Sequence, residues 1–101
     1  MTKIGDLPLH DSVVSSIHLH WAEHRVEILL SVFVEKGQTA RPYRLQFHGV
    51  SYFEAPHTAP WGESASINGV SEGAGKFELE MQSGDVINIE AEGFSFVPIT
   101  S

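Results

Sequence analysis

Three histidines are the side chains in this sequence best suited to chemistry. His18 and His20 are two residues apart, so on an extended strand both imidazoles project from the same face. His48 lies in a later segment of the same alternating type and could join them if the two strands are close. Three imidazoles with an open fourth position form a catalytic zinc ligand set, which gives the hypothesis of a metal site at these three residues. The expected strand pairing puts Glu27 opposite His20, where a carboxylate would orient the ring. The alternative is a half-exposed polar face without chemistry.

Two other motifs resemble catalytic or nucleotide-binding sequences but lack essential features. His10, Asp11 and Ser12 are adjacent, and adjacent residues cannot converge through space into a catalytic triad. The Gly-Ala-Gly-Lys segment at 73–76 lacks both the earlier glycine and the following Ser or Thr of a phosphate-binding loop. The chain has no cysteine, which excludes disulfides, thiolate metal sites and a cysteine nucleophile. We therefore expect a protein without a catalytic site or cofactor.

Acidic residues are concentrated in the second half of the chain. Residues 1–53 have no net charge, whereas residues 54–101 carry eight acids and one base and account for the whole formal charge of −7. Glu78 and Glu80 alternate on one expected strand, and Glu90 lies on the next. This charge repels nucleic-acid phosphates and attracts basic proteins, so the predicted partner is a basic protein. The alternative is that the acids only maintain solubility.

Trp61 is the most prominent aromatic residue in a proline-rich loop that spans residues 54–64. An aromatic side chain in such a loop can anchor a protein partner, or it can fold back as a lid over the core. We therefore add Trp61 to Glu78, Glu80 and Glu90 as the predicted partner-binding residues.

The elements that must position these residues are short β-strands, because apolar and polar residues alternate along most of the chain. In the first expected hairpin the apolar residues match when Trp21 faces Val26 and Val13 faces Val34. This register leaves residues 22–25 as a four-residue loop, which is a common hairpin length.

A second hairpin is indicated by two independent signals. Its apolar faces coincide only if Met81 opposes Asp85 and Leu79 opposes Ile87. The remaining loop, residues 82–84, ends in a glycine, which readily adopts the positive φ that a three-residue hairpin loop requires.

The complete pattern predicts an all-β domain. Six or seven short strands without a long helix indicate an antiparallel sandwich or a strongly curved, partly open barrel. Residues 64–67 are expected to form a short strand, and the glycine-rich residues 68–76 to be the most mobile segment. With 101 residues, of which 42% are hydrophobic, we expect one domain over residues 1–101. The unpaired edges of such a sheet make a homo-oligomer an additional possibility.

The location is also predicted from composition. The first residues, MTKIGDLPLHDS, lack the apolar core of a signal peptide, and no apolar run approaches the length of a membrane span. Together with the absence of cysteine, this indicates a cytoplasmic protein that does not enter a membrane.

Three segments carry a resemblance to known proteins: LHDSVVSSIHLHW, FHGVSYF and MQSGDVINIEA, in that order. They resemble small uncharacterised bacterial all-β proteins and, more loosely, all-β immunity proteins of bacterial toxin systems. For the immunity-type relatives, the resemblance implies an acidic single-domain inhibitor of a basic toxin. The expected function is therefore a non-enzymatic protein-binding module with an acidic C-terminal half, and the resemblance implies an immunity protein or antitoxin. The alternative is a metal-binding protein that uses His18, His20 and His48.

Overall fold

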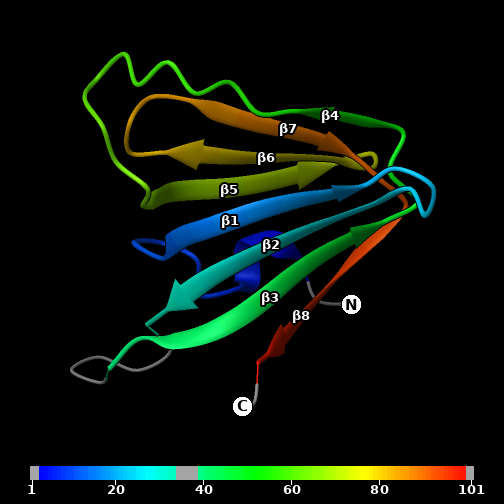
Figure 1. The fold of residues 1–101 in the computed structure, drawn as a ribbon, viewed down its shortest axis with the longest axis horizontal. Coiled ribbons are helices and arrows are strands. Elements are labelled where there is room, and N and C mark those ends of the chain that lie inside the picture. Colours follow the sequence, from blue (N-terminus) through cyan, green and yellow to red (C-terminus); the bar gives the residue numbers. More distant parts are fainter. Residues whose placement is uncertain (1–2, 34–38, 100–101) are drawn as a thin grey trace.

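Two four-stranded antiparallel sheets face each other in a sandwich that is not closed into a barrel (Figure 1). This computed structural model describes residues 3–33 and 39–99. Within them, the elements are a 3-10 helix η1 (Ile4–Asp6) and strands β1 (Val13–His20), β2 (Arg25–Val32), β3 (Arg41–His48), β4 (Tyr52–Glu54), β5 (Ile67–Gly73), β6 (Lys76–Met81), β7 (Val86–Glu90) and β8 (Gly93–Pro98). The first sheet has the order β1-β2-β3-β8 and the second β4-β7-β6-β5. The predicted antiparallel sandwich is confirmed, with eight strands in the described chain instead of six or seven.

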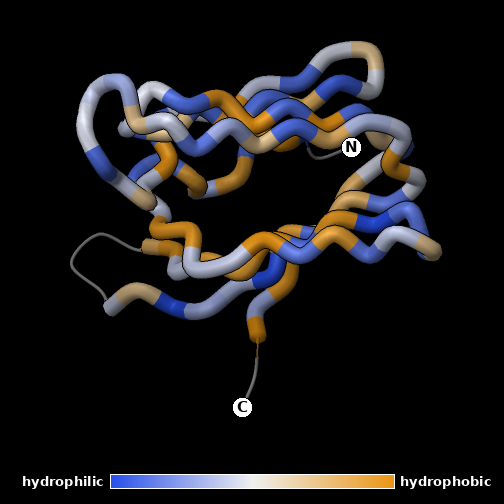
Figure 2. The backbone as a smooth tube through the Cα atoms, turned by 45° about the horizontal axis from the view of Figure 1, so that its top comes forward, coloured by the Kyte–Doolittle hydropathy of each residue, from blue (hydrophilic) through white to orange (hydrophobic). Residues whose placement is uncertain are grey.

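The alternation of residues along the strands builds the core between the sheets (Figure 2). The side chains that fill it are buried: Val26, Ile28, Leu30, Val32, Leu45 and Phe47 from the first sheet, and Ile67, Phe77, Leu79, Met81, Ile87 and Ile89 from the second. Three rings join the sheets, because the centroid of Phe47 lies 5.1 Å from that of Phe77 and 6.3 Å from that of Phe94. Burial of this apolar surface is the main stabilising contribution to the fold.

The register of the first hairpin differs from the prediction. Val26 pairs with Leu19 instead of Trp21, so the four-residue turn is 21–24. Trp21 thereby enters the turn, where 84% of its surface is exposed. A two-residue shift keeps every side chain on its face, so the apolar pattern alone could not detect it. The predicted partner of Val13, Val34, lies outside the described residues.

A β-bulge between Val14 and Ser16 interrupts the pairing of β1 with β2. The extra residue, Ser15, donates a hydrogen bond from its hydroxyl to the Leu29 carbonyl at 2.8 Å. The bulge turns Val14 toward the core and leaves Val13 exposed, although Val13 was predicted to face inward.

The second hairpin forms as predicted. Leu79 pairs with Ile87, and the Met81 amide donates to the Asp85 carbonyl at 2.8 Å. The turn ends in Gly84, whose φ of 93° lies in the region that glycine adopts most easily.

Residues 68–76, predicted to be a mobile segment, instead form most of β5 and its turn into β6. Val70 packs against the core and pairs with Leu79. The outward positions of this strand carry glycine and serine, which are typical of loops, so the sequence does not indicate a strand here.

The short strand predicted at 64–67 is reduced to one bridge between Ser66 and Val13. Hydrogen bonds from the Val14 amide to Ala65 and from the Ile67 amide to Ser12, both 2.8 Å, join the two sheets at this corner.

Replacing Phe47 with alanine tests the contribution of the aromatic contacts between the sheets. Because Phe47 is fully buried, the Phe47→Ala variant should lower the free energy of unfolding by about 3–5 kcal/mol. The matched control is Val97→Ala on the outer face of the first sheet, which should change it by less than about 0.5 kcal/mol. Urea denaturation measures both, and equal effects would contradict the placement of the core.

Candidate functional site

The first two histidines lie on the outer face of the first sheet, next to an ion pair. His18, instead of the expected His20, pairs directly with Glu27, because of the register shift. The His20 Nε2 atom still lies 3.4 Å from Glu27 Oε2, diagonally across the two strands. The other oxygen of this carboxylate is 2.6 Å from Nε of Arg44. Glu27 therefore serves primarily as the counter-ion of an arginine.

His48 is separated from the other two histidines by a whole strand. β2 lies between β1 and β3, so the backbones of His20 and His48 are about 10 Å apart at the usual strand spacing, with Arg25 opposite His20. The His48 ring lies across Gly93, where an added Cβ would be 2.8 Å from His48 Nε2. Among residues 3–33 and 39–99, no three His, Cys, Asp or Glu side chains are grouped to hold a metal ion. The structure does not bring the predicted ligands together.

The predicted acidic residues share the outer face of the second sheet. Glu78 and Glu80 are exposed and alternate with buried Phe77 and Leu79 along β6. Glu90 of β7 points to the same side and pairs with Lys76 and Tyr52 on its two neighbours. Glu54 of β4 completes the group, opposite Asn88. We call this surface the acidic face; it consists of Glu54, Glu78, Glu80 and Glu90, with Lys76 as its single base and with Tyr52.

The carboxylates of the acidic face have little internal compensation. No ion pair in the described chain involves Glu78, Glu80 or Glu90. The Tyr52 hydroxyl donates a hydrogen bond to the Glu54 carboxylate, and this contact raises the pKa of Tyr52, with further contributions from burial and from the negative charges of Glu54 and Glu90. The face therefore presents uncompensated negative charge to solvent.

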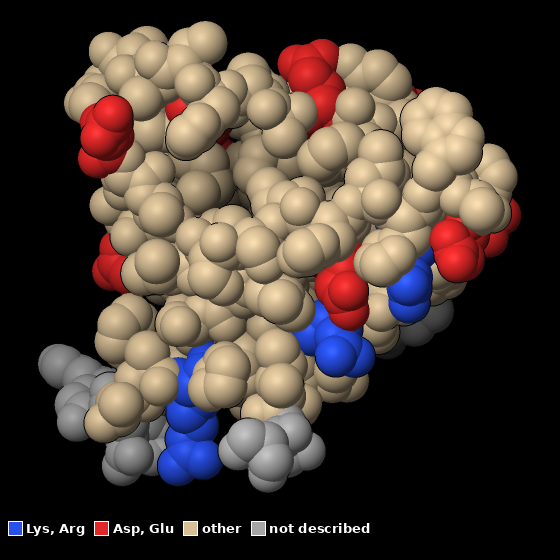
Figure 3. All heavy atoms as spheres, viewed as in Figure 1, with Lys and Arg blue, Asp and Glu red and all other residues tan. Residues whose placement is uncertain are grey.

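The two sheets differ in charge. The strands of the first sheet carry the bases Arg25, Arg41 and Arg44 and one acid, a net charge of +2. The strands of the second sheet carry five acids and one base, a net charge of −4. In Figure 3, the visible Lys and Arg residues lie in the lower half, over β2 and β3, whereas most acids lie above and around the rim. A charged partner would therefore approach in a preferred orientation.

A hollow of about 830 Å³ adjoins the acidic face at the end where β1 turns into β2. Its aromatic and aliphatic wall includes Leu19, Trp21 and Tyr52, each substantially exposed, and its rim includes Glu23 and Glu92. We call it the aromatic hollow. This hollow was not predicted from the sequence, because the predicted register placed Trp21 opposite Val26 within the apolar set of the first hairpin, whereas Trp21 lies in the turn.

Trp61 lies at the opposite end of the second sheet, beside the β6–β7 turn. Its amide donates to the Ser83 carbonyl at 2.9 Å, and its ring packs so closely on Gly84 that an added Cβ would lie 2.8 Å from it. The side chain is nevertheless 71% exposed. The backbone of Trp61 is therefore held in place while its ring is open to solvent. The residue lies beside the turn that follows β6, near the end of the strand that carries Glu80, and far from the aromatic hollow.

The loop over residues 55–65, which we call the anchored loop, is held by the Asp85 carboxylate. The amides of Thr58 and Ala59 donate to Asp85 at 2.9 Å each, the Thr58 hydroxyl donates at 2.9 Å and the Ser83 hydroxyl at 2.8 Å. Asp85 is almost inaccessible to solvent, so these four donors are its main stabilisation. The Thr58 amide is the largest contribution that lowers the pKa of Asp85; burial opposes it, and the other donors add to it, bringing the pKa from 3.8 to about 2.

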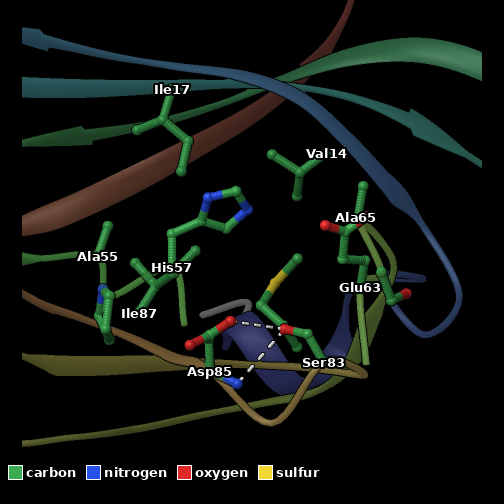
Figure 4. Close-up of a pocket in the computed structure, with 12 residues that line it drawn as sticks. Val14, Ile17, Ala55, His57, Glu63, Ala65, Ser83, Asp85 and Ile87 are labelled. Carbon is green, nitrogen blue, oxygen red and sulfur yellow. Dashed lines mark hydrogen bonds between the residues drawn. The ribbon is translucent and has the colours of Figure 1, made fainter. Parts of the chain in front are cut away.

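A second cavity, of about 520 Å³, lies between the sheets and the anchored loop (Figure 4). We call it the inter-sheet cavity. Its lining is mostly apolar, with Val14 and Ile17 from β1 and Met81 and Ile87 from the second sheet. His57 extends from the loop toward Ile17 and Val14. His57 lies in an irregular loop, so no alternating pattern in the sequence could have indicated its direction.

Comparison with known proteins identifies one solved structure of the same architecture. An uncharacterized protein from Neisseria gonorrhoeae matches with a TM-score of 0.56 and 14% sequence identity, over 89% of this chain and 93% of that chain. At this identity the similarity shows the fold alone. No protein-family model and no curated protein matches the chain. Within residues 3–33 and 39–99, no helix is long and apolar enough to span a membrane.

The Asp85 contacts predict a specific pH dependence of stability. The pKa of Asp85 is lower in the folded protein than its ordinary value of 3.8, so its stabilisation is present above about pH 4 and is lost as the pH falls toward 2. The Asp85→Asn variant lacks this contribution. Its melting temperature at pH 7 should be lower than that of the original protein, and the melting temperature should fall less between pH 4 and pH 2. Glu63→Gln, an exposed change of the same type in the anchored loop, is the control and should follow the original protein. If the melting temperatures of the original protein and of Asp85→Asn changed in parallel with pH, this role of Asp85 would be contradicted.

Proposed function

We propose that this protein is a non-enzymatic binding module whose acidic face holds a basic protein partner, in the manner of an immunity protein or antitoxin. The observation that best supports this is the placement of Glu54, Glu78, Glu80 and Glu90 on one solvent-facing side of a sheet with a single lysine. The face lies on adjacent strands with regular pairing, so its charges are held at fixed spacing. A rigid binding surface loses little conformational freedom on association.

The charge arrangement favours rapid association with a basic partner. Uncompensated carboxylates on one face attract an approaching cationic surface, and the opposite charge of the first sheet disfavours the reverse orientation. Such steering acts mainly on the association rate and weakens as salt screens it, with a screening length of about 8–10 Å at 0.10–0.15 M salt. The proposed binding should therefore be fast and sensitive to salt.

The aromatic hollow supplies the apolar contact that charge alone does not provide. Tyr52 belongs to both surfaces, since it pairs with Glu90 on the sheet and lines the hollow with Trp21 and Leu19. Tyr and Trp are frequent anchors of protein interfaces, and their faces also attract Arg and Lys cations. A basic loop could thus place a cation over Trp21 while its neighbours contact the acidic face.

One feature of the sequence favours action in a reducing cytoplasm. The chain has no cysteine, so its stability does not depend on disulfides.

The proposal is tested by removing three charges from the acidic face. The variant Glu78→Gln/Glu80→Gln/Glu90→Gln should associate with a basic partner more slowly, by about tenfold or more at low salt, and with a flatter salt dependence. The control is Asp6→Asn/Asp11→Asn/Glu63→Gln, which removes the same charge from exposed positions outside the acidic face and the aromatic hollow. The partner is obtained by affinity capture from lysate at low and high salt, and stopped-flow mixing then gives the rates.

Three outcomes of this experiment would contradict the proposal. Equal capture by both triple variants would show that only net charge matters. Retention that is independent of salt would remove the electrostatic mechanism. Recovery of only the protein's own chain would indicate self-association through sheet edges instead.

A further inference from the structure

The inter-sheet cavity has the dimensions and lining of a small-molecule site. Its volume of about 520 Å³ lies within the roughly 300–1,000 Å³ typical of ligand pockets. Its walls come from both sheets, so a molecule inside would contact Val14 and Ile17 on one side and Met81 and Ile87 on the other. A small ligand would thus bury apolar surface against both sheets.

The walls of the cavity are fixed before any ligand arrives. The Asp85 carboxylate holds Thr58 and Ala59, next to His57, and the Trp61 amide is bonded to Ser83. At the other end of the anchored loop, Ala65 accepts a hydrogen bond from Val14 at 2.8 Å. The bulge in β1 turns Val14 into the cavity. A preformed site of this kind loses little entropy when it binds a ligand.

Two polar side chains at the cavity remain available to a ligand. His57 directs its ring toward β1, and in the described part of the chain its nitrogens form no hydrogen bond (Figure 4). Glu63 lines the cavity near its rim, is exposed, and likewise has no hydrogen bond or ion pair to described residues. Asp85, in contrast, already accepts hydrogen bonds on both oxygens and is committed to the loop. A neutral imidazole can accept a hydrogen bond, and a free carboxylate attracts a cation.

We propose that the inter-sheet cavity binds a small amphipathic amine, with its apolar body between the sheets and its ammonium group near Glu63 and His57. The formal net charge of −7 adds to the preference for a cation over an anion. This site is separate from the acidic face and the aromatic hollow, so it does not depend on the function proposed above.

The proposal is tested with two probes of nearly equal shape and opposite charge. Tryptamine and indole-3-propionate share an indole ring and differ in the charge of the terminal group. In nitrogen-15 NMR titrations, tryptamine should shift the amide signals of Val14, Ile17, Ser83 and Ile87, and should bind about fivefold or more tightly than the acid. Glu63→Gln should reduce this preference about two- to fivefold, and His57→Ala should weaken tryptamine binding about fivefold.

The matched control is Glu23→Gln, which removes a charge at the rim of the aromatic hollow and should leave tryptamine binding unchanged. The spectrum of each free variant reports whether it is folded, and the comparison of the two probes on the original protein needs no variant. The proposal is overturned if neither probe shifts the cavity signals, if the shifts centre on Trp21, or if indole-3-propionate binds as tightly as tryptamine.

Discussion

The Asp85 carboxylate holds together the segments that define one end of this molecule. It sits at the exit of the β6–β7 turn and accepts hydrogen bonds from two amides of the anchored loop and from two hydroxyls. Without it, the amides of exposed Thr58 and partly buried Ala59 and the hydroxyl of buried Ser83 would lose this partner. A buried group left unpaired typically costs about 1–3 kcal/mol, and a group that water can reach costs less. The bonds from Thr58 and Ala59 hold the backbone next to His57 and with it the outer wall of the inter-sheet cavity. Trp61 is held beside this loop by its own amide bond to the Ser83 carbonyl. A structural role of this kind also explains why a buried aspartate here needs no catalytic interpretation.

The outer faces of the sandwich are where the chain has most freedom to carry function. The core requires apolar residues at every second position, and the other positions can vary without disturbing the packing. On the first sheet, the single acid, Glu27, is compensated by Arg44. On the second sheet the carboxylates form no ion pair with any residue that the structure describes, and the exposed rings of Tyr52 and Trp21 lie at the adjoining hollow. Uncompensated like charges on one face work against the isolated fold, and their repulsion would be relieved by a basic partner.

Local patterns in the sequence were sufficient for part of this structure. The β6–β7 hairpin followed from two matching apolar faces and a glycine at a position that needs positive φ, and both constraints are local. The first hairpin was placed two residues out of register because Trp21 was treated as a core residue, and the bulge at Ser15 has no signal of its own. β5 was missed because its outward positions carry glycine and serine, which usually indicate loops.

The candidate sites depended on information that local patterns do not contain. The outward direction of Glu78 and Glu80 followed from alternation, and the structure places them as expected. The proximity of His48 to His18 and His20 required the strand order, and β2 proved to lie between them. The inter-sheet cavity depends on contacts between His57, Asp85 and β1 that are far apart in sequence, so only the folded chain reveals it.

The central claim, that the acidic face is the binding surface, is tested most directly by mapping the captured basic protein onto this one. Nitrogen-15 NMR spectra recorded during titration would locate the contact residue by residue. The account predicts that the largest shifts fall on β4, β6 and β7 and around the aromatic hollow, and that they diminish when salt is added. Shifts confined to β2 and β3, or to the inter-sheet cavity, would contradict it.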